Sequence, residues 1–426
     1  MKSNFVHLVL TLVMAGAASA ADKPHWLLGR ATKLPSQYAN QESGYFSIVE
    51  GLNGRLYIGA AKYGENAYLL EYDPKTDSTV MVVDAMKLIG SDAKGFAAQA
   101  KFHTRNNVGA SGKIYVGTKQ GYPEKGESRD LYPGGYVMTY DPKTKIAEHF
   151  GIAKPKHGII SVTPDEQRGL IYLSTCSDDR PVEHSHFMVL DAKSKTYTDL
   201  GDMEHAYAFI VLDHLGRAYH PIRGGTVARY DPATKKLERL KVSVDGQPAP
   251  KEITKEGAIL NWEVSPDRKT LYAVEMTTNQ LFAFDLTAAG DTIPGKTMGP
   301  LLSSEPKTDC RAMCVGPDGV VWAAVTAKPA AGGLHLVMRE PNKPPRDCGS
   351  IGVANPDFTT FTDSAGKSKP WHHTMPQAPD GTRAPWQPMG VCAAHDGSVY
   401  VLTIAPFTLI RFERNQMRNQ LRPEIK

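Results

Sequence analysis

The stretch that decides the fold begins with Ser111-Gly112-Lys113-Ile114-Tyr115 and ends with Tyr140-Asp141-Pro142. Its first part is typical of a tight turn followed by a strand, because glycine supplies the positive φ that such turns require. Its last part indicates the end of a further strand, because Asp-Pro presets the next turn. Both signals return along the chain at intervals of roughly 45 to 60 residues, which is the spacing of a repeat architecture.

The turn-and-strand signal occurs seven times, and each copy ends in Tyr or Trp. The copies begin at Asn53, Ser111, Arg168, Leu215, Arg268, Asp318 and Asp396. Four short strand-like runs in each repeat predict an all-β chain that folds as a seven-bladed β-propeller. The last repeat lacks a fourth run, so we expect the amino-terminal run Trp26–Leu34 to supply that outer strand and close the ring.

The amino terminus predicts a signal peptide over residues 1–20. It has a charged Lys2, an apolar run from Val6 to Ala15, and small residues Ala18-Ser19-Ala20 before the expected cleavage. Residues 21–426 then form a single propeller domain that is secreted or periplasmic. No later apolar run reaches 18 residues, so we expect no membrane insertion. The net charge of +4 over 426 residues does not favour a nucleic-acid partner, and we expect a monomer.

The chain has five cysteines, an odd number for an exported protein. Three interpretations stay open: buried thiols in inner strands, one disulfide, or a structural zinc or other divalent metal. The metal site would use Cys310 and Cys348 with His335.

Histidine, tyrosine and arginine side chains gather in the second, third and fourth repeats. The loops that enter the innermost strands and those that follow the second strands open on one face of a propeller, where ligands usually bind. Candidate catalytic residues there are His103, Tyr207 and Arg223, and candidate substrate-binding residues are Arg105, Asn106, Lys119, Tyr122, His157 and His220. Proton transfer by these side chains would require no cofactor.

Imidazole, phenol and guanidinium together suit the abstraction of a proton next to a carboxylate. Arginine neutralises the carboxylate, after which a His or Tyr base can act and a second acidic group protonates the leaving oxygen. We therefore expect β-elimination at a 4-linked uronic acid, with an acidic polysaccharide as the partner. Arg223 would bind the carboxylate, while Tyr207 and His103 divide the roles of base and acid.

The same residues resemble those of the secreted seven-bladed propeller polysaccharide lyases, in particular the ulvan lyases. The resemblance rests on His103-Thr104-Arg105 with Gly112-Lys113-Ile114-Tyr115, and on Tyr207 followed sixteen positions later by Arg223. It implies that His103 and Tyr207 handle protons and that Arg223 neutralises the uronate. This chain departs from the pattern at Lys119-Gln120, where a second histidine is expected.

Two other classes of function are open. A propeller glycoside hydrolase would need two facing carboxylates about 5 to 10 Å apart. Its candidates are Glu124, Glu127, Asp130, Asp178, Asp179 and Glu183. A non-catalytic propeller that binds glycans or acts as a scaffold would instead present an apolar or aromatic platform.

Overall fold

The computed structural model describes residues 25–39, 45–177, 184–204, 209–250, 262–303, 308–327, 333–355, 360–362, 368–370, 377–405 and 407–419. The signal peptide and Tyr207 lie outside these ranges. Strands dominate the described residues, as the sequence predicts, and helices are short.

The first half of the chain contains the strands β1 (Trp26–Lys33), β2 (Ile48–Glu50), β3 (Leu56–Lys62), β4 (Asn66–Asp73), β5 (Ser78–Asp84), β6 (Lys101–Phe102), β7 (Asn107–Val108), β8 (Ile114–Lys119), β9 (Tyr136–Asp141), β10 (Ile146–Ile152), β11 (Gly158–Asp165), β12 (Leu170–Cys176), β13 (His186–Asp191) and β14 (Thr196–Asp202). Its helical turns are α1 (Ala85–Leu88), η1 (Gly95–Ala97) and η2 (Arg129–Leu131).

The second half contains β15 (Val211–Leu212), β16 (Ala218–Ile222), β17 (Thr226–Asp231), β18 (Lys236–Val244), β19 (Gln247–Pro248), β20 (Trp262–Val264), β21 (Thr270–Val274), β22 (Gln280–Asp285), β23 (Thr292–Pro300), β24 (Asp309–Val315), β25 (Val321–Thr326), β26 (Leu334–Arg339) and β27 (Arg346–Val353). It ends with β28 (Thr360–Thr362), β29 (Ser368–Pro370), β30 (Trp386–Ala393), β31 (Val399–Ala405), β32 (Phe407–Phe412) and α2 (Arg414–Asn419).

The repeated sequence signals form the turns that the sequence predicts. Gly112 has a φ of 90° in the turn before β8, and the other glycine-containing copies also have positive φ there. The fifth copy lacks glycine, and Arg268 adopts the left-handed conformation in its place, with a φ of 57°. At the other signal, the Asp141 carboxylate accepts a hydrogen bond from the Lys143 backbone N–H at 2.9 Å and thereby stabilises the turn after β9.

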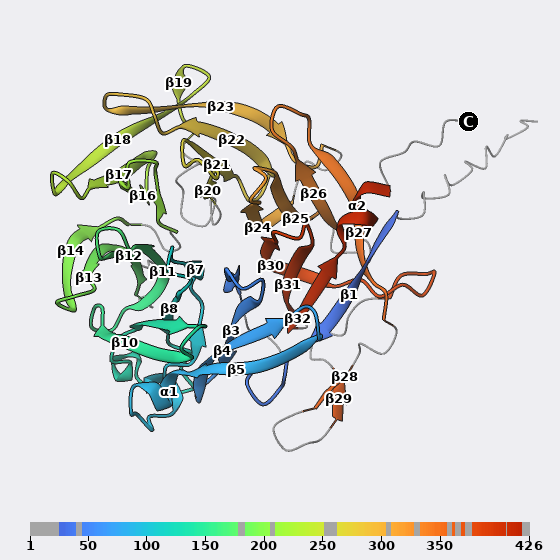
Figure 1. Cartoon of the computed structure of the whole chain (residues 1–426), viewed down its shortest axis with the longest axis horizontal. Helices are drawn as coiled ribbons and strands as arrows, with labels where there is room; N and C mark the ends of the chain where they lie inside the picture. The colour runs from blue at the N-terminus through green and yellow to red at the C-terminus, as the bar shows by residue number, and fades with distance from the viewer. Residues whose placement is uncertain are drawn as a thin grey trace, which may run out of the picture.

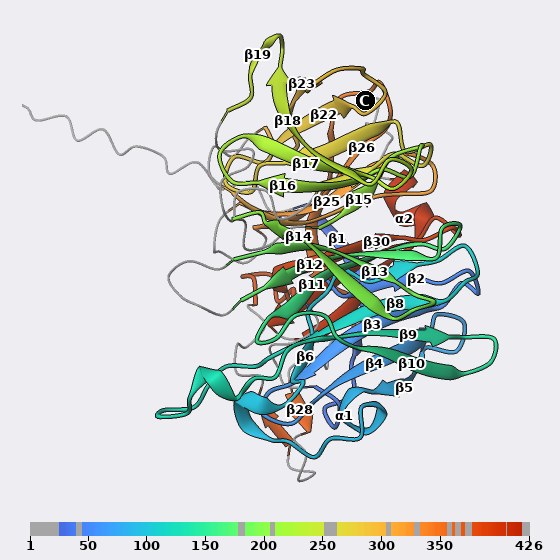
Figure 2. The ribbon, with the colours of Figure 1, turned by 90° about the vertical axis from the view of Figure 1, so that its left-hand side faces the viewer.

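Consecutive strands pair in antiparallel order, as in β11-β12-β13-β14 and β24-β25-β26-β27. Figure 1 shows these groups set around a common middle, with β7, β11, β20, β24 and β30 nearest to it. In the side view the strands run mostly from one broad face of the molecule to the other (Figure 2). Buried side chains fill the space between neighbouring groups. Tyr57 and Leu69, for example, pack against Ile114 and Met138.

Strand β1 joins the two ends of the chain (Figure 1). Its first half, Trp26 to Gly29, runs parallel to β27, and its second half, Arg30 to Lys33, runs antiparallel to β32. The strand thus pairs with the last strand of the chain, where the sequence predicts it, and also with the neighbouring group. Gly29 permits the close approach, since a Cβ there would lie 2.5 Å from Ile410 Cγ2.

No helix among the described residues is long and apolar enough to cross a membrane.

Candidate functional site

A break in an inner strand sets His103 and its neighbours apart from the regular sheet. Strand β6 ends at Phe102 and β7 begins at Asn107, so residues 103–106 lie between two short strands. At this break the chain turns toward the next strand group, where the Arg105 N–H donates to the Ile160 carbonyl at 3.1 Å. Side chains in the break are therefore directed by tertiary contacts rather than by strand alternation.

Two buried lysines face each other across neighbouring strands beside this break. Lys101 of β6 pairs with Lys119 of β8, and each is 3% exposed. Like charges directly opposite each other in an antiparallel pair are destabilising. Burying both ammonium groups adds a desolvation cost.

The two ammonium groups have different surroundings. Lys119 Nζ donates to the Cys176 sulfur at 3.3 Å. Lys101 Nζ lies over three tyrosine rings, 5.4 Å from the centroid of Tyr45, 5.5 Å from Tyr63 and 4.4 Å from Tyr122. Each such cation–π contact stabilises by about 0.5 to 2 kcal/mol, depending on its exposure to solvent. We call Lys101, Lys119, His103 and these three tyrosines the lysine–tyrosine cluster.

The tyrosine hydroxyls of the cluster contact one another. The Tyr45 hydroxyl lies 2.5 Å from that of Tyr63 and 3.3 Å from that of Tyr122. Burial raises the pKa of Tyr45 far above its usual value, and repulsion from Tyr63 and Tyr122 adds to the shift. Tyr45 therefore remains a neutral phenol that can donate a hydrogen bond.

His103 is held as a neutral imidazole in this cluster. Its ring lies 4.0 Å from that of Tyr45 and 5.6 Å from that of Phe46, centroid to centroid. Burial lowers the pKa of His103 well below 6.5, and the charges of Lys101 and Lys119 lower it further. At neutral pH the imidazole thus carries no charge, so one ring nitrogen can accept a proton.

The Gln120 carboxamide lies beside Lys119. A Cβ at Gly158 would come 2.4 Å from Lys119 Cγ and 2.6 Å from Gln120 Oε1. Both side chains therefore pack directly against the glycine, which has no side chain to exclude them. Gln120 is 1% exposed, and neither polar atom of its carboxamide has a hydrogen-bond partner among the residues that the structure describes. A buried amide without partners costs about 1 to 3 kcal/mol. This group is suited to hydrogen-bond a polar ligand next to the lysine.

The other candidate residues have varied surroundings. Arg105 forms an ion pair with Glu263 and donates to the Trp262 carbonyl at 2.8 Å. Asn106 accepts a hydrogen bond from Ser47 at 2.7 Å. Both line a cavity of about 270 Å³ at the middle of the molecule.

His157 contacts Thr175 Oγ1 at 3.2 Å through Nδ1. His220 is completely buried and contacts Ser174 Oγ at 3.0 Å. The Arg223 side chain is exposed, and its backbone N–H donates to the Met203 carbonyl.

The structure therefore brings His103, Lys119 and Tyr122 together and adds Lys101, Tyr45 and Tyr63, which the sequence analysis missed. One signal could have found Tyr63. Tyr63 directly follows β3, the strand of the repeated turn-and-strand signal in the first repeat. In the second repeat the corresponding strand is β8, which ends at Lys119 and is followed by Tyr122. The pairing of Lys101 with Lys119 joins strands β6 and β8. No local pattern in the sequence reveals it.

Loop carboxylates that a glycoside hydrolase would need have other contacts. Glu127 accepts hydrogen bonds from the Phe96 and Glu124 backbone N–H groups, which lower its pKa. Asp130 pairs with Lys156, which also lowers the pKa of this carboxyl. A hydrolytic general acid needs a raised pKa instead. Asp178, Asp179 and Glu183 lie outside the described residues.

The residues proposed for a metal site are on three strands of one sheet. Cys310, His335 and Cys348 belong to β24, β26 and β27. Cys310 packs with Leu301 and Val325, whereas Cys348 packs in a different cluster with Leu27 and Trp322. His335 Nδ1 contacts Asp347 at 2.9 Å. Within the described ranges, no three His, Cys, Asp or Glu side chains are grouped to hold a metal ion.

All five cysteines are buried, and none is joined to another by a disulfide. Burial raises the pKa of Cys348 to about 11 and that of Cys392 to about 12, which makes both thiols poor nucleophiles. We expect five thiols to react with a thiol reagent in denaturant, and almost none in the native protein. Three reactive thiols after unfolding without reductant would indicate a disulfide. One equivalent of zinc in the purified protein would favour the metal site.

His103 should also make the stability of the protein depend on pH. Its pKa is lower in the folded chain than in the unfolded chain, so below pH 6.5 the unfolded state takes up the extra proton. The free energy of unfolding should then fall by about 1.4 kcal/mol per pH unit from this residue alone. Urea unfolding from pH 8 to pH 5 should show a shallower slope for His103→Gln. His214→Gln, at an exposed position, should keep the wild-type slope.

Comparison with known proteins identifies the fold. No family model and no curated protein matches the chain. Among solved structures, a streptogramin B lyase is 13% identical, with a TM-score of 0.52 over 90% of this chain and 96% of that one. The β-propeller domain of Cps50 (Swd1) from Myceliophteria thermophila is 9% identical, with a TM-score of 0.53 over 90% of this chain and 99% of that one. The fold is a β-propeller. At such low identity these likenesses establish the fold alone.

A third similar structure is the extracellular domain of a putative hybrid two-component system from B. thetaiotaomicron. It is 11% identical, with a TM-score of 0.51, and the match covers 90% of this chain but 39% of that one.

Proposed function

We propose that this protein is an exported polysaccharide lyase that cleaves a uronic-acid-containing, ulvan-like polysaccharide by β-elimination. The observation that carries the proposal is a neutral, buried His103 in the positive field of Lys101 and Lys119. A base next to fixed positive charge is what proton abstraction from an acidic sugar requires, since that charge stabilises the carboxylate as it becomes more negative.

In the proposed reaction His103 and Tyr207 transfer the protons. One of them takes the proton from C5 of the uronate, the electron pair forms the C4–C5 double bond, and the C4–O bond breaks. The other protonates the leaving oxygen. Tyr207 lies outside the described residues, but Phe209 follows two positions later, and its ring contacts that of Phe46 at 5.2 Å. Phe46 in turn contacts His103.

Arg223, which follows β16, would bind the uronate carboxylate, and Lys119 with Gln120 would bind a further acidic group of the polymer. The exposure of Arg223 leaves its guanidinium accessible to a polymer.

The proposed scaffold is a propeller of seven blades closed by β1. Among the described residues, seven hydrophobic clusters support this number. Six of them join strands of two neighbouring groups, and the seventh joins β15–β18 with β20–β23 and also contains residues of other groups. One of the six packs Leu56 and Tyr72 against Leu402 and Leu409, so the first and last groups are in contact.

The decisive experiment is to incubate the mature protein with a panel of uronic-acid polysaccharides. The ultraviolet absorbance of a 4,5-unsaturated uronate is measured over time. Elimination produces this chromophore. New reducing ends without the chromophore would assign the protein to the glycoside hydrolases. Binding without either product would make it a glycan-binding propeller.

Two conservative substitutions test the sequence-derived roles. Tyr207→Phe removes only the hydroxyl, and Arg223→Lys replaces a planar bidentate group with a point charge. We expect both variants to lose nearly all turnover and to keep the wild-type melting temperature. Wild-type rates in both would remove these residues from the proposed site.

A further inference from the structure

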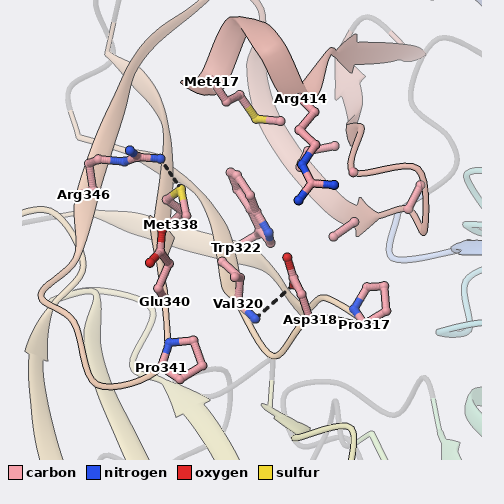
Figure 3. Close-up of a pocket in the computed structure, with 14 residues that line it drawn as sticks. Pro317, Asp318, Val320, Trp322, Met338, Glu340, Pro341, Arg346, Arg414 and Met417 are labelled. Atoms are coloured by element: carbon pink, nitrogen blue, oxygen red, sulfur yellow. Dashed lines mark hydrogen bonds between the residues drawn. The ribbon is translucent and has the colours of Figure 1, made fainter. Parts of the chain in front are cut away.

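A second pocket, of about 310 Å³, lies at the side of the molecule where Pro317, Asp318 and Gly397 form strand-connecting turns. Its walls come from β25, β26 and β31, and α2 covers it (Figure 3). The volume is at the lower end of the range for small-molecule sites, about 300 to 1,000 Å³. The lysine–tyrosine cluster contributes no lining residue.

The pocket has an apolar, aromatic interior. Trp322 lies at its centre in Figure 3, with Met338 on one side and Met417 of α2 above. Met417 is 4% exposed and belongs to the same hydrophobic cluster as Trp322, so it fixes α2 in place over the pocket. A flat apolar group would find an aromatic ring and two polarisable sulfur atoms here.

Two arginines flank this interior. In Figure 3 the Arg346 and Arg414 guanidinium groups lie on opposite sides of Trp322. The absence of a side chain at Gly397 leaves room for the aliphatic part of Arg414 to pack against this turn, because a Cβ there would lie 2.5 Å from Arg414 Cδ. Arg346 contacts the Met338 sulfur.

The carboxylates nearby form no direct ion pair with these two guanidinium groups, although Lys343 and, to a smaller extent, Arg346 lower the pKa of Glu340. Glu340 forms its ion pair with Lys343, and Asp318 accepts a hydrogen bond from the Val320 N–H at 3.2 Å. Neither Arg346 nor Arg414 forms an ion pair with a carboxylate anywhere in the described ranges. The pocket therefore combines an aromatic interior with two guanidinium groups that remain able to bind an anion, and arginine binds carboxylates in a planar, bidentate manner.

We propose that this pocket binds a small organic anion, a carboxylate carried on a flat apolar body. The apolar body lies against Trp322 and Met417, and the carboxylate binds one of the two arginines, Arg346 or Arg414, that flank the ring. The site is separate from the proposed lyase site and does not depend on that assignment.

Calorimetric titration of the full mature chain with 2-naphthoate tests the proposal, with the uncharged 2-naphthamide as the matched probe. We expect one saturable site for 2-naphthoate and at least tenfold weaker binding of the amide. At least one of the variants Arg346→Gln and Arg414→Gln should weaken 2-naphthoate binding at least tenfold. The control Arg239→Gln alters an exposed arginine of β18 and should leave binding unchanged.

Equal binding of acid and amide, or wild-type binding in both arginine variants, would overturn the proposal. So would the absence of any saturable binding in wild-type protein with a normal melting curve. If 2-naphthoate bound only after residues 420–426 were deleted, the pocket would belong to the carboxyl-terminal segment of the chain rather than to a small molecule.

Discussion

His103→Gln is expected to lower the rate of polysaccharide cleavage by about 10²- to 10⁴-fold, the usual cost of removing a general acid or base. Glutamine retains polar atoms of similar reach but cannot take up a proton near neutral pH. The effect should appear in kcat, measured from the chromophore of the unsaturated product. The melting temperature at pH 8 should remain close to that of the wild type.

His184→Ala is the control for this substitution. The His184 imidazole pairs with Asp202, and its side chain is 44% exposed, outside the lysine–tyrosine cluster. We expect this variant to retain substantial activity. If His103→Gln turned over the polymer at the wild-type rate, His103 would not be the base.

Lys101→Met provides a test that does not depend on total activity. Removing a positive charge near His103 favours the imidazolium, so the pKa of His103 should rise. The acid limb of the kcat/KM profile should therefore move to higher pH. Lys113→Met, at a position away from the cluster, should leave the profile in place. An unmoved acid limb in Lys101→Met would mean that the profile reports another group.

Leu27→Ala should destabilise the protein by about 2 to 5 kcal/mol, because it removes a fully buried side chain from the core. Leu27 is 1% exposed on β1 and packs among residues of β25, β27 and β32. Its neighbour Leu28 is 40% exposed on the same strand. Leu28→Ala should therefore change the free energy of unfolding by no more than about 0.5 kcal/mol.

Urea unfolding of the two leucine variants measures this difference. The protein as a whole is stable by only about 5 to 15 kcal/mol, so the loss at Leu27 would be a large fraction of the total. Deleting residues 21–34 should then abolish soluble folded protein, because β27 and β32 would both lose β1, the strand that joins them. A cooperative melt at the wild-type temperature after this deletion would contradict the proposal that β1 closes the propeller.

Local signals in the sequence were sufficient to predict the strands and turns. Glycine in the repeated turns and aspartate at the strand ends determine the backbone conformation only within a few residues of their own positions. Each copy of the signal can therefore be recognised separately. The all-β propeller followed from their recurrence. The pairing of β1 with β32 was also predictable, since the last repeat lacked one strand.

The site required information that no local pattern contains. Histidine and tyrosine residues marked the second to fourth repeats, but the aromatic neighbours of His103 come from the first repeat. Tyr45 and Tyr63 belong to the first repeat, and Lys101 lies opposite Lys119 because β6 joins β3 to β8. Arg105 pairs with Glu263, a residue far away in the sequence.

The sequence by itself therefore determined the repeat, the turn chemistry and the residue types available to the proposed site. Only the tertiary structure decided which of these side chains meet and which charges they carry. The lowered pKa of His103 arises from burial and from two lysine charges. Burial and charge proximity are properties of the packed chain, so they exist only after strands from separate repeats have come together.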